Sequence, residues 1–131
     1  MRVGFVQNNP IFANIQENLS RVEKLLAGQS ADLFVLPELF ATGYQFKDQE
    51  ESRSLAELVP TGITTSKLTA IAKNTNTFII AGLVEIEGDQ VYNSAVVTGP
   101  EGYIGKYRKL HLFDTEKDCF QKGNLPLQVF D

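Results

Sequence analysis

The sequence is poor in the residues that build metal centres and disulfide frameworks. It has one cysteine, Cys119, and one histidine, His111, among 131 residues. A single cysteine has no internal partner for a disulfide, and one cysteine with one histidine is too few for the usual zinc sites. We therefore expect no metal ion and no disulfide, and a lone reduced thiol suits a cytoplasmic protein.

Charge and hydropathy argue against two further classes of protein. The chain has 12 basic and 16 acidic residues and a net charge of −4, so no basic excess indicates nucleic-acid binding. No apolar run approaches the ~18 residues that a membrane-spanning helix needs. The N-terminus also lacks the basic and apolar segments of a signal peptide. The composition is that of an ordinary globular domain with a small-molecule partner.

Apolar runs alternate with amphipathic helical segments, and this order predicts an α/β fold. Continuous apolar strands of this kind imply a sheet covered by helices. Asn14 is placed to cap a first helix and Gly28 to end it. We expect helices over residues 15–27, 49–58 and 64–74. We expect strands over residues 2–7, 32–36, 78–87, 91–98 and 103–110, a charged loop over 114–124, and the start of another strand over 125–130.

Glu38 is the first candidate for a catalytic group, because it directly follows the apolar strand of residues 32–36. Open α/β sheets bind their ligands at the carboxyl ends of their strands. A carboxylate that emerges there among apolar neighbours is partly removed from water, which suits a general base. The alternative is a surface or helix-capping glutamate at the end of a strand.

Lys109 is the second candidate, and it stands at the end of the strand of residues 103–110. Side chains alternate along a strand, so Lys109 shares a face with Tyr107. Lys106 and Arg108 point to the opposite face. An ammonium on the aromatic side can pair with an acidic group or stabilise a developing oxyanion. The alternative is a basic run with all its charges in water, since lysines are rarely buried.

Cys119 and His111 are weaker candidates. Cys119 lies in a charged segment, where Glu116 and Asp118 raise the pKa of a thiol rather than lower it, so we expect a structural role. His111 has no cysteine or serine at a spacing that would form a dyad. Nucleophile elbows of the G-x-S-x-G type, phosphate loops and dinucleotide-binding glycine motifs are also absent from the sequence.

Several short segments stand in a specific order along the chain. They are VLPELF at 35–40, TGY at 42–44, YNSA at 92–95 and GKYRKLHLF at 105–113, with Glu116 four residues before Phe120. With this order and spacing the whole chain resembles the nitrilase superfamily of carbon–nitrogen hydrolases. The resemblance implies an αββα sandwich, of which this chain forms one half.

The resemblance also implies a catalytic set of glutamate, lysine and cysteine. In this sequence Glu38 matches the general base and Lys109 the group that stabilises the tetrahedral intermediate. Glu116 matches a second glutamate that positions the substrate and Lys109. Tyr44 and Asn93 match positions near the substrate. The implied reaction is thiol attack on an amide, carbamoyl-amine or nitrile of a small molecule, and no cofactor is implied.

The family nucleophile has no counterpart among these residues, because its position falls beyond Asp131. We therefore expect residues 1–131 to be the N-terminal part of a single hydrolase domain, inactive without the remaining half. The family also implies a homo-oligomer, a dimer or larger. The alternative from another class is a non-catalytic α/β domain that binds a small molecule or serves as a scaffold.

Overall fold

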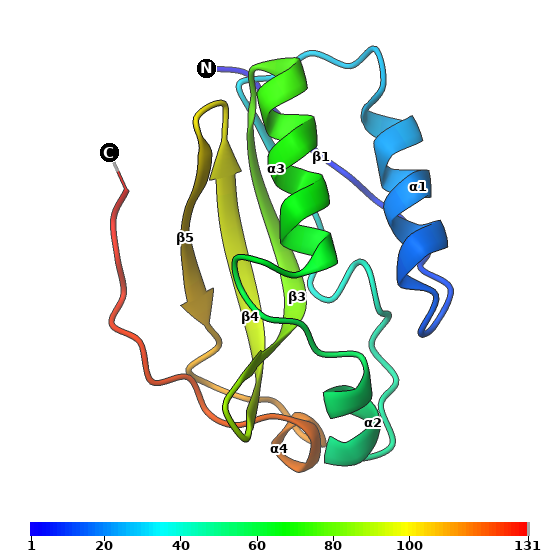
Figure 1. The fold of residues 1–131 in the computed structure, drawn as a ribbon, viewed down its shortest axis with the longest axis vertical. Helices are drawn as coiled ribbons and strands as arrows, with labels where there is room; N and C mark the ends of the chain where they lie inside the picture. The colour runs from blue at the N-terminus through cyan, green and yellow to red at the C-terminus, as the bar shows by residue number, and fades with distance from the viewer. Residues whose placement is uncertain (131) are drawn as a thin grey trace.

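The computed structural model describes residues 1–130 and confirms a mixed α/β fold, with helices and a five-stranded sheet (Figure 1). The elements in chain order are β1 (Val3–Phe5), α1 (Ile15–Leu26), β2 (Leu33–Val35), α2 (Gln49–Ser54), α3 (Ile63–Thr75), β3 (Phe78–Glu87), β4 (Gln90–Gly99), β5 (Gly102–Arg108) and α4 (Glu116–Cys119). No helix within residues 1–130 is long and apolar enough to cross a membrane.

The strands follow one another across the sheet in the order β1-β2-β3-β4-β5. The pairs β1–β2 and β2–β3 are parallel, whereas β3–β4 and β4–β5 are antiparallel. Parallel neighbours need long crossovers, which α1 and the segment carrying α2 and α3 provide. Short turns join the antiparallel strands. The carboxyl end of β2 therefore lies beside the middle of the long hairpin β3–β4.

One face of the sheet is covered by α1 and α3 (Figure 1). Helix α1 has the predicted termini: the Asn14 side chain accepts a hydrogen bond from the Glu17 amide, and Gly28 adopts a φ of +74° just after the helix. The apolar face of α1 packs with residues of α3, β3 and β4. The core comprises, among others, Leu19, Val22, Leu26, Leu68, Ile71, Ala72, Ile79, Ala81, Leu83 and Val96.

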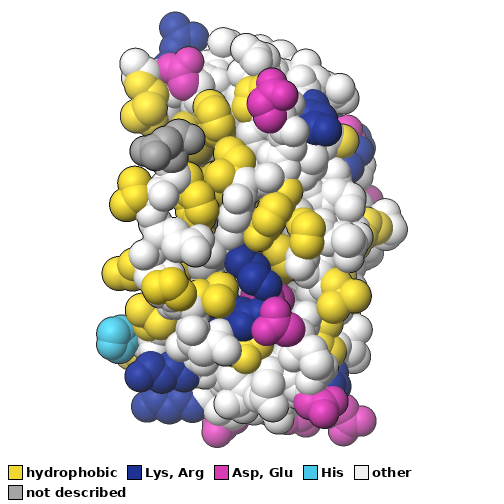
Figure 2. All heavy atoms as spheres, turned by 60° about the vertical axis from the view of Figure 1, so that its left-hand side comes forward, with side chains coloured by type: hydrophobic (Ala, Val, Ile, Leu, Met, Phe, Trp, Pro, Cys, Tyr) yellow, Lys and Arg dark blue, Asp and Glu magenta, His cyan; other side chains and the backbone are white. Residues whose placement is uncertain are grey.

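The opposite face of the sheet is largely uncovered. Strand register places Val3, Phe5, Val35 and Tyr107 on this face. Val3 is 54% exposed and Phe5 is 81% exposed. Figure 2 brings the side of β5 and the C-terminal segment forward and shows hydrophobic side chains over much of that surface. Large apolar side chains gathered on one surface indicate a site of association.

The predicted strand over residues 125–130 is wrong, because these residues form no ladder in the structure. Pro126 lacks a backbone N–H, which a ladder requires. Instead the segment runs beside β5, where the Phe130 ring lies against the backbone of Gly105; a Cβ at Gly105 would come within 2.4 Å of that ring.

Two further predictions need correction. Helix α2 ends at Ser54 rather than at residue 58, because the backbone of Glu57 pairs with β3 at Val84 and Ile86. The predicted charged loop over residues 114–124 contains the one-turn helix α4, whose two buried residues are Glu116 and Cys119. Burial of these side chains against the rest of the protein orders a segment that is polar in sequence.

Candidate active site

Glu38 stands at the carboxyl end of β2 on a strained turn. The next residue, Leu39, has a φ of +51° although it is not glycine, and its side chain is buried. Such a conformation costs on the order of 1–3 kcal/mol and persists only where surrounding structure enforces it. The Leu39 carbonyl accepts hydrogen bonds from the amides of Thr42 and Gly43, which close the turn. The turn aims the Glu38 side chain across β3 and β4.

Gly82 of β3 allows this turn to approach the sheet. A Cβ at Gly82 would lie 2.7 Å from Glu38 Cα and 2.9 Å from the Leu39 nitrogen. Any larger residue would therefore push the Glu38 backbone away from the hairpin. The sequence analysis missed this role, although a glycine inside an apolar strand is a known signal of close backbone approach.

Lys109 follows β5 and faces Glu38, as the alternation of side chains predicted. Its backbone N–H donates to the Asn93 carbonyl over 2.9 Å, which fixes it beside β4. Its Nζ lies 2.8 Å from Glu38 Oε1 and 2.9 Å from Glu116 Oε1. The alternative of a fully solvated basic run is wrong, since Arg108 is only 1% exposed.

Glu116 comes to the same point from α4. Its Oε1 accepts hydrogen bonds from Lys109 Nζ, Asn93 Nδ2 and the Tyr44 hydroxyl, and its Oε2 accepts from the Phe113 amide. Burial raises the pKa of Glu116, but the bonds from Tyr44, Phe113 and Lys109 outweigh burial and hold the pKa below its usual value. Glu116 is therefore an ionised carboxylate whose two oxygens are both engaged.

Asn93 of β4 bridges the two carboxylates. Its Nδ2 donates to Glu38 Oε1 over 2.6 Å and to Glu116 Oε1 over 3.1 Å. The side chain is almost fully buried. Because an amide nitrogen carries two hydrogens, both of its donors are used within the site.

Tyr44 reaches Glu116 from the loop that follows Glu38, and about half of the residue is exposed. Burial of the hydroxyl, its hydrogen bond to Glu116 and the charge of Glu38 raise the pKa of Tyr44 to about 12. The phenol is therefore protonated near neutral pH and acts as a donor to Glu116.

The charges of the site differ in how free they are to react. Burial lowers the pKa of Lys109, but the hydrogen bonds to Glu38 and Glu116 outweigh burial and raise the pKa above its usual value. Lys109 therefore stays in its ammonium form. The Glu38 side chain is 40% exposed, because it opens onto the uncovered face. Within residues 1–130, Glu38 accepts hydrogen bonds through Oε1 alone. Its Oε2 therefore accepts no hydrogen bond from the described residues.

Glu38, Asn93 and Lys109 border a groove of about 360 Å³ on the uncovered face. Its lining comprises Leu36, Glu38, Ile80, Gly82, Asn93, Ser94, Ala95, Tyr107 and Lys109. The groove is lined mainly by apolar and small side chains, and its charged residues are Glu38 and Lys109. Such a groove suits a small substrate whose reacting carbon lies beside Glu38 and Lys109.

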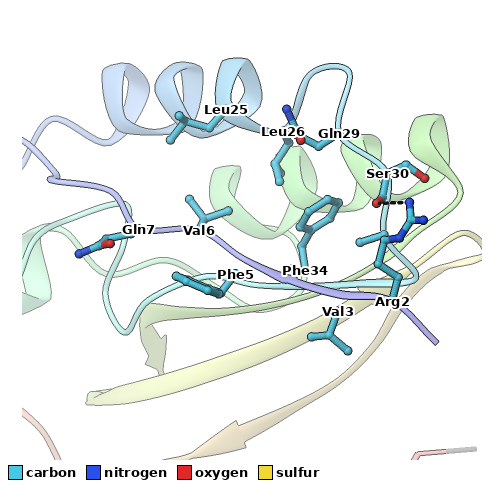
Figure 3. A pocket seen from close by; sticks show the side chains of 12 residues that line it. Arg2, Val3, Phe5, Val6, Gln7, Leu25, Leu26, Gln29, Ser30 and Phe34 are labelled. Atoms are coloured by element: carbon cyan, nitrogen blue, oxygen red, sulfur yellow. Dashed lines mark hydrogen bonds between the residues drawn. The ribbon is translucent and has the colours of Figure 1, made fainter.

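A second cavity of about 320 Å³ lies at the other edge of the sheet, between β1 and α1 (Figure 3). Figure 3 shows Val6, Leu26 and Phe34 around it, with Arg2 bonded to the Ser30 carbonyl at its rim. None of the predicted site residues lines this cavity. The polar groups of this cavity do not converge on one point, so the cavity has no arrangement of side chains that resembles an active site.

Cys119 does not join the groove. It is buried in α4, and its Sγ lies 3.9 Å from the Phe46 carbonyl. Burial and the charges of Asp118, Asp48 and Glu51 raise the pKa of its thiol, in the direction that the sequence predicted. A thiol held protonated in this way is a poor nucleophile.

The described residues offer no alternative centre based on a metal. Within residues 1–130, no group of three or more histidine, cysteine or carboxylate side chains is placed to hold a metal ion. His111 lies exposed on the surface. The cluster of Glu38, Lys109 and Glu116, with Asn93 and Tyr44, is therefore the strongest candidate site.

The sequence is similar to known nitrilases and amidases. The sequence is 48% identical to a nitrilase of Pyrococcus abyssi over 100% of this chain and 51% of the relative. It is 39% identical to the omega-amidase NIT2 of Homo sapiens over 74% of this chain and 36% of the relative. The chain thus spans about half or less of the length of these relatives.

Solved structures show the same fold. An N-terminal amidase superposes with a TM-score of 0.82 at 28% identity, over 90% of this chain and 30% of that protein. A carbon–nitrogen hydrolase superfamily protein from Xanthomonas campestris, XC1258, superposes with a TM-score of 0.80 at 26% identity, over 98% of this chain and 48% of that protein. Residues 2–131 match the carbon-nitrogen hydrolase family. The chain therefore belongs to the carbon–nitrogen hydrolase family, as its motifs predicted.

Proposed function

We propose that the complete protein hydrolyses a non-peptide carbon–nitrogen bond of a small amide, carbamoyl-amine or nitrile. Glu38, Lys109 and a cysteine thiol from outside residues 1–131 would carry the reaction. The observation that supports this best is Lys109 Nζ, which lies within 2.9 Å of both carboxylates while one oxygen of Glu38 stays free. Relatives named nitrilase and omega-amidase support the same class of reaction.

Glu38 acts as the general base in this proposal. Its free Oε2 takes the proton of the thiol as the sulfur attacks the substrate carbon and forms a C–S bond. For an amide, the tetrahedral intermediate then collapses, and the C–N bond breaks as the same carboxyl returns its proton to the leaving nitrogen. Water, deprotonated by Glu38, hydrolyses the thioester and regenerates the thiol.

Lys109 stabilises the oxyanion of the tetrahedral intermediate. Its ammonium is held between two carboxylates, so it needs little reorganisation when negative charge develops on the substrate oxygen. The raised pKa of Lys109 keeps the charge in place throughout the cycle. Loss of one such donor typically costs about 3 kcal/mol of transition-state stabilisation.

The remaining residues orient these groups. Glu116, saturated with donors, keeps its charge and fixes Lys109. Asn93 spends both amide hydrogens on the carboxylates, so we assign it to holding Glu38 and Glu116 apart at a set distance. Tyr44 donates to Glu116 and is about half exposed, and we assign its ring to contact with the substrate.

The remaining half of the domain is the first partner that we propose. It would supply the nucleophile and pack on the uncovered face of the sheet, completing the αββα sandwich. The exposed Val3 and Phe5 on that face support this packing. We further propose a homo-oligomer, by analogy with the family, and a cytoplasmic location, because a thiol nucleophile must remain reduced.

The test uses the full-length protein and a panel of short amides, carbamoyl-amines and nitriles. Ammonia release identifies the substrate class, and intact mass after rapid quenching detects the acyl-enzyme. We expect turnover with at least one class and a mass adduct on a cysteine outside residues 1–131. Glu38→Gln should suppress the adduct.

The matched control is Glu101→Gln, which removes the same charge from an exposed turn between β4 and β5. It should leave turnover unchanged. A protein that binds members of the panel but never releases ammonia or forms an adduct would refute the hydrolase proposal. That result would instead favour the non-catalytic binding domain.

A further inference from the structure

A buried ion cluster lies on the face of the sheet opposite to the candidate site. Glu85 of β3 is 0% exposed and Arg108 of β5 is 1% exposed. Arg108 Nε lies 3.0 Å from Glu85 Oε2, and its second terminal nitrogen lies 2.5 Å from Glu85 Oε1. Lys106 and the Ser94 hydroxyl also donate to Glu85. The proposed reaction uses none of these groups.

Hydrogen bonds favour the ionised form of Glu85. Burial raises the pKa of Glu85, but the hydrogen bonds from Arg108, Lys106 and Ser94 outweigh burial and hold it below its usual value. Burying two charges costs free energy that only good geometry repays, so such a pair is a poor device for stability alone. A bidentate arginine–carboxylate pair does, however, fix orientation closely.

Arg108 links several segments at once. Its guanidinium carbon lies 3.9 Å from the centre of the Tyr92 ring on β4. Its other terminal nitrogen donates to Asn124 Oδ1 over 2.7 Å. Asn124 belongs to the segment that follows α4 and passes the end of β5 (Figure 1). There the Gly123 amide donates to the Lys109 carbonyl over 2.9 Å.

Each of these links ends beside a residue of the candidate site. Tyr92 and Ser94, which contact Arg108 and Glu85, flank Asn93 on β4. Arg108 itself directly precedes Lys109. Because side chains alternate along a strand, fixing Arg108 and Ser94 on one face fixes Lys109 and Asn93 on the other.

We propose that Glu85 and Arg108 form a positioning pair, which acts through the sheet to hold Lys109 and Asn93 in register with Glu38 and Glu116. The proposal deepens the function proposed above and rests on it for its kinetic consequence. The pair does not contact the substrate. It positions the Lys109 ammonium, which does. Arg108 also ties the segment after α4, so the pair fixes the side from which Glu116 approaches.

The kinetic test compares Arg108→Lys, Arg108→Met and Glu85→Gln in the full-length protein. A misplacement of about 1 Å typically costs on the order of 10² in rate, so we expect kcat to fall by about that factor in Arg108→Met. We expect KM to change little, because the pair makes no substrate contact. Arg108→Lys keeps the positive charge but loses the bidentate contact with Glu85, so its kcat should lie between those of Arg108→Met and the parent.

Two controls separate positioning from general loss of structure. Val22→Ala weakens the core on α1, and Glu23→Gln removes an ion pair with Lys67 that joins α1 to α3. Both should retain the parent kcat in the folded fraction. The positioning role is refuted if Val22→Ala lowers kcat as much as Arg108→Met, or if Arg108→Met retains the parent kcat.

A second readout needs no activity. Trace acetylation of the native protein reports how firmly each lysine ammonium is held, and mass spectrometry resolves the sites. In the parent, Lys109 should react slowly relative to Lys67. In Glu85→Gln and Arg108→Met the ratio should rise several-fold, whereas in Val22→Ala it should stay constant. If the ratio of Lys109 to Lys67 acetylation is unchanged in both Glu85→Gln and Arg108→Met, the positioning pair is refuted, even if the parent protein hydrolyses none of the tested substrates. A parent protein without turnover refutes only the proposed function.

Discussion

Gly82→Ala is the substitution whose effect the structure predicts most directly. The added Cβ would lie 2.7 Å from Glu38 Cα and 2.9 Å from the Leu39 nitrogen, which is 0.7 Å and 0.5 Å short of ordinary van der Waals contact at 3.4 Å. Both neighbours are backbone atoms, so no side chain can rotate away. Leu39 is already in a left-handed conformation and buried, which leaves the turn little freedom.

The consequence is a displacement of Glu38 away from Lys109. A shift of 0.7 Å along the contact between Glu38 Oε1 and Lys109 Nζ would lengthen it from 2.8 Å to about 3.5 Å, the outer limit of a hydrogen bond. Misplacement of about 1 Å costs on the order of 10² in rate, and overpacking typically costs about 1–3 kcal/mol of stability. We therefore expect acylation by the folded fraction to slow by about 10², which is about 2.7 kcal/mol of transition-state stabilisation.

The assay is single-turnover acylation of the full-length protein, paired with thermal unfolding. Gly88→Asn is the control, because Gly88 lies in open space with a φ of +57°, which asparagine tolerates. It should acylate at the parent rate. Gly82→Ala acylating within about twofold of the parent, while fully folded, would refute the close-approach argument.

The other predictions concern the charges of the site. Glu38→Gln should lower the acylation rate by ~10²–10⁴, and Lys109→Ala should cost about 3 kcal/mol of transition-state stabilisation. The double variant should be little worse than the poorer single variant, because the effects of groups that act as a unit are not additive. An additive double variant would contradict this. The pKa of Glu116 is lowered in the folded protein. The stabilisation from Glu116 is therefore present above its ordinary pKa of 4.5 and is lost as the pH falls through the folded pKa. Tyr44→Phe removes the hydrogen bond that lowers this pKa most, so its deficit in Tm should be larger at about pH 7 than at about pH 3, and equal deficits would count against it. Cys119→Ala should leave turnover within a few-fold of the parent, because its thiol is buried with a raised pKa; loss of the acyl-enzyme in that variant would reverse the assignment.

Local patterns in the sequence predicted much of the secondary structure. The spacing of apolar residues and the two end signals located α1, since both Asn14 and Gly28 act within one turn of the chain. Alternation of side chains along the strand predicted that Lys109 and Arg108 lie on opposite faces of the sheet. The errors came where distant residues intervene: Glu57 pairs with β3 and shortens α2, and burial of Glu116 and Cys119 orders α4.

The candidate site depended on both levels. The types and order of Glu38, Tyr44, Asn93, Lys109 and Glu116 stand in the sequence, and their motifs indicated the family. Their distances from one another do not. Only the packing of β2, β4, β5 and α4 brings Lys109 Nζ to 2.8 Å from one carboxylate and 2.9 Å from the other.

The sequence by itself determined the fold class and the opposite faces of Lys109 and Arg108, because periodicity and end signals act over a few residues. Tertiary structure alone decided the strained turn at Leu39, its approach to Gly82 and the burial of Arg108 on Glu85. These features join residues that are remote in the chain. Their geometry follows from long-range packing and desolvation, which no local pattern of residues encodes.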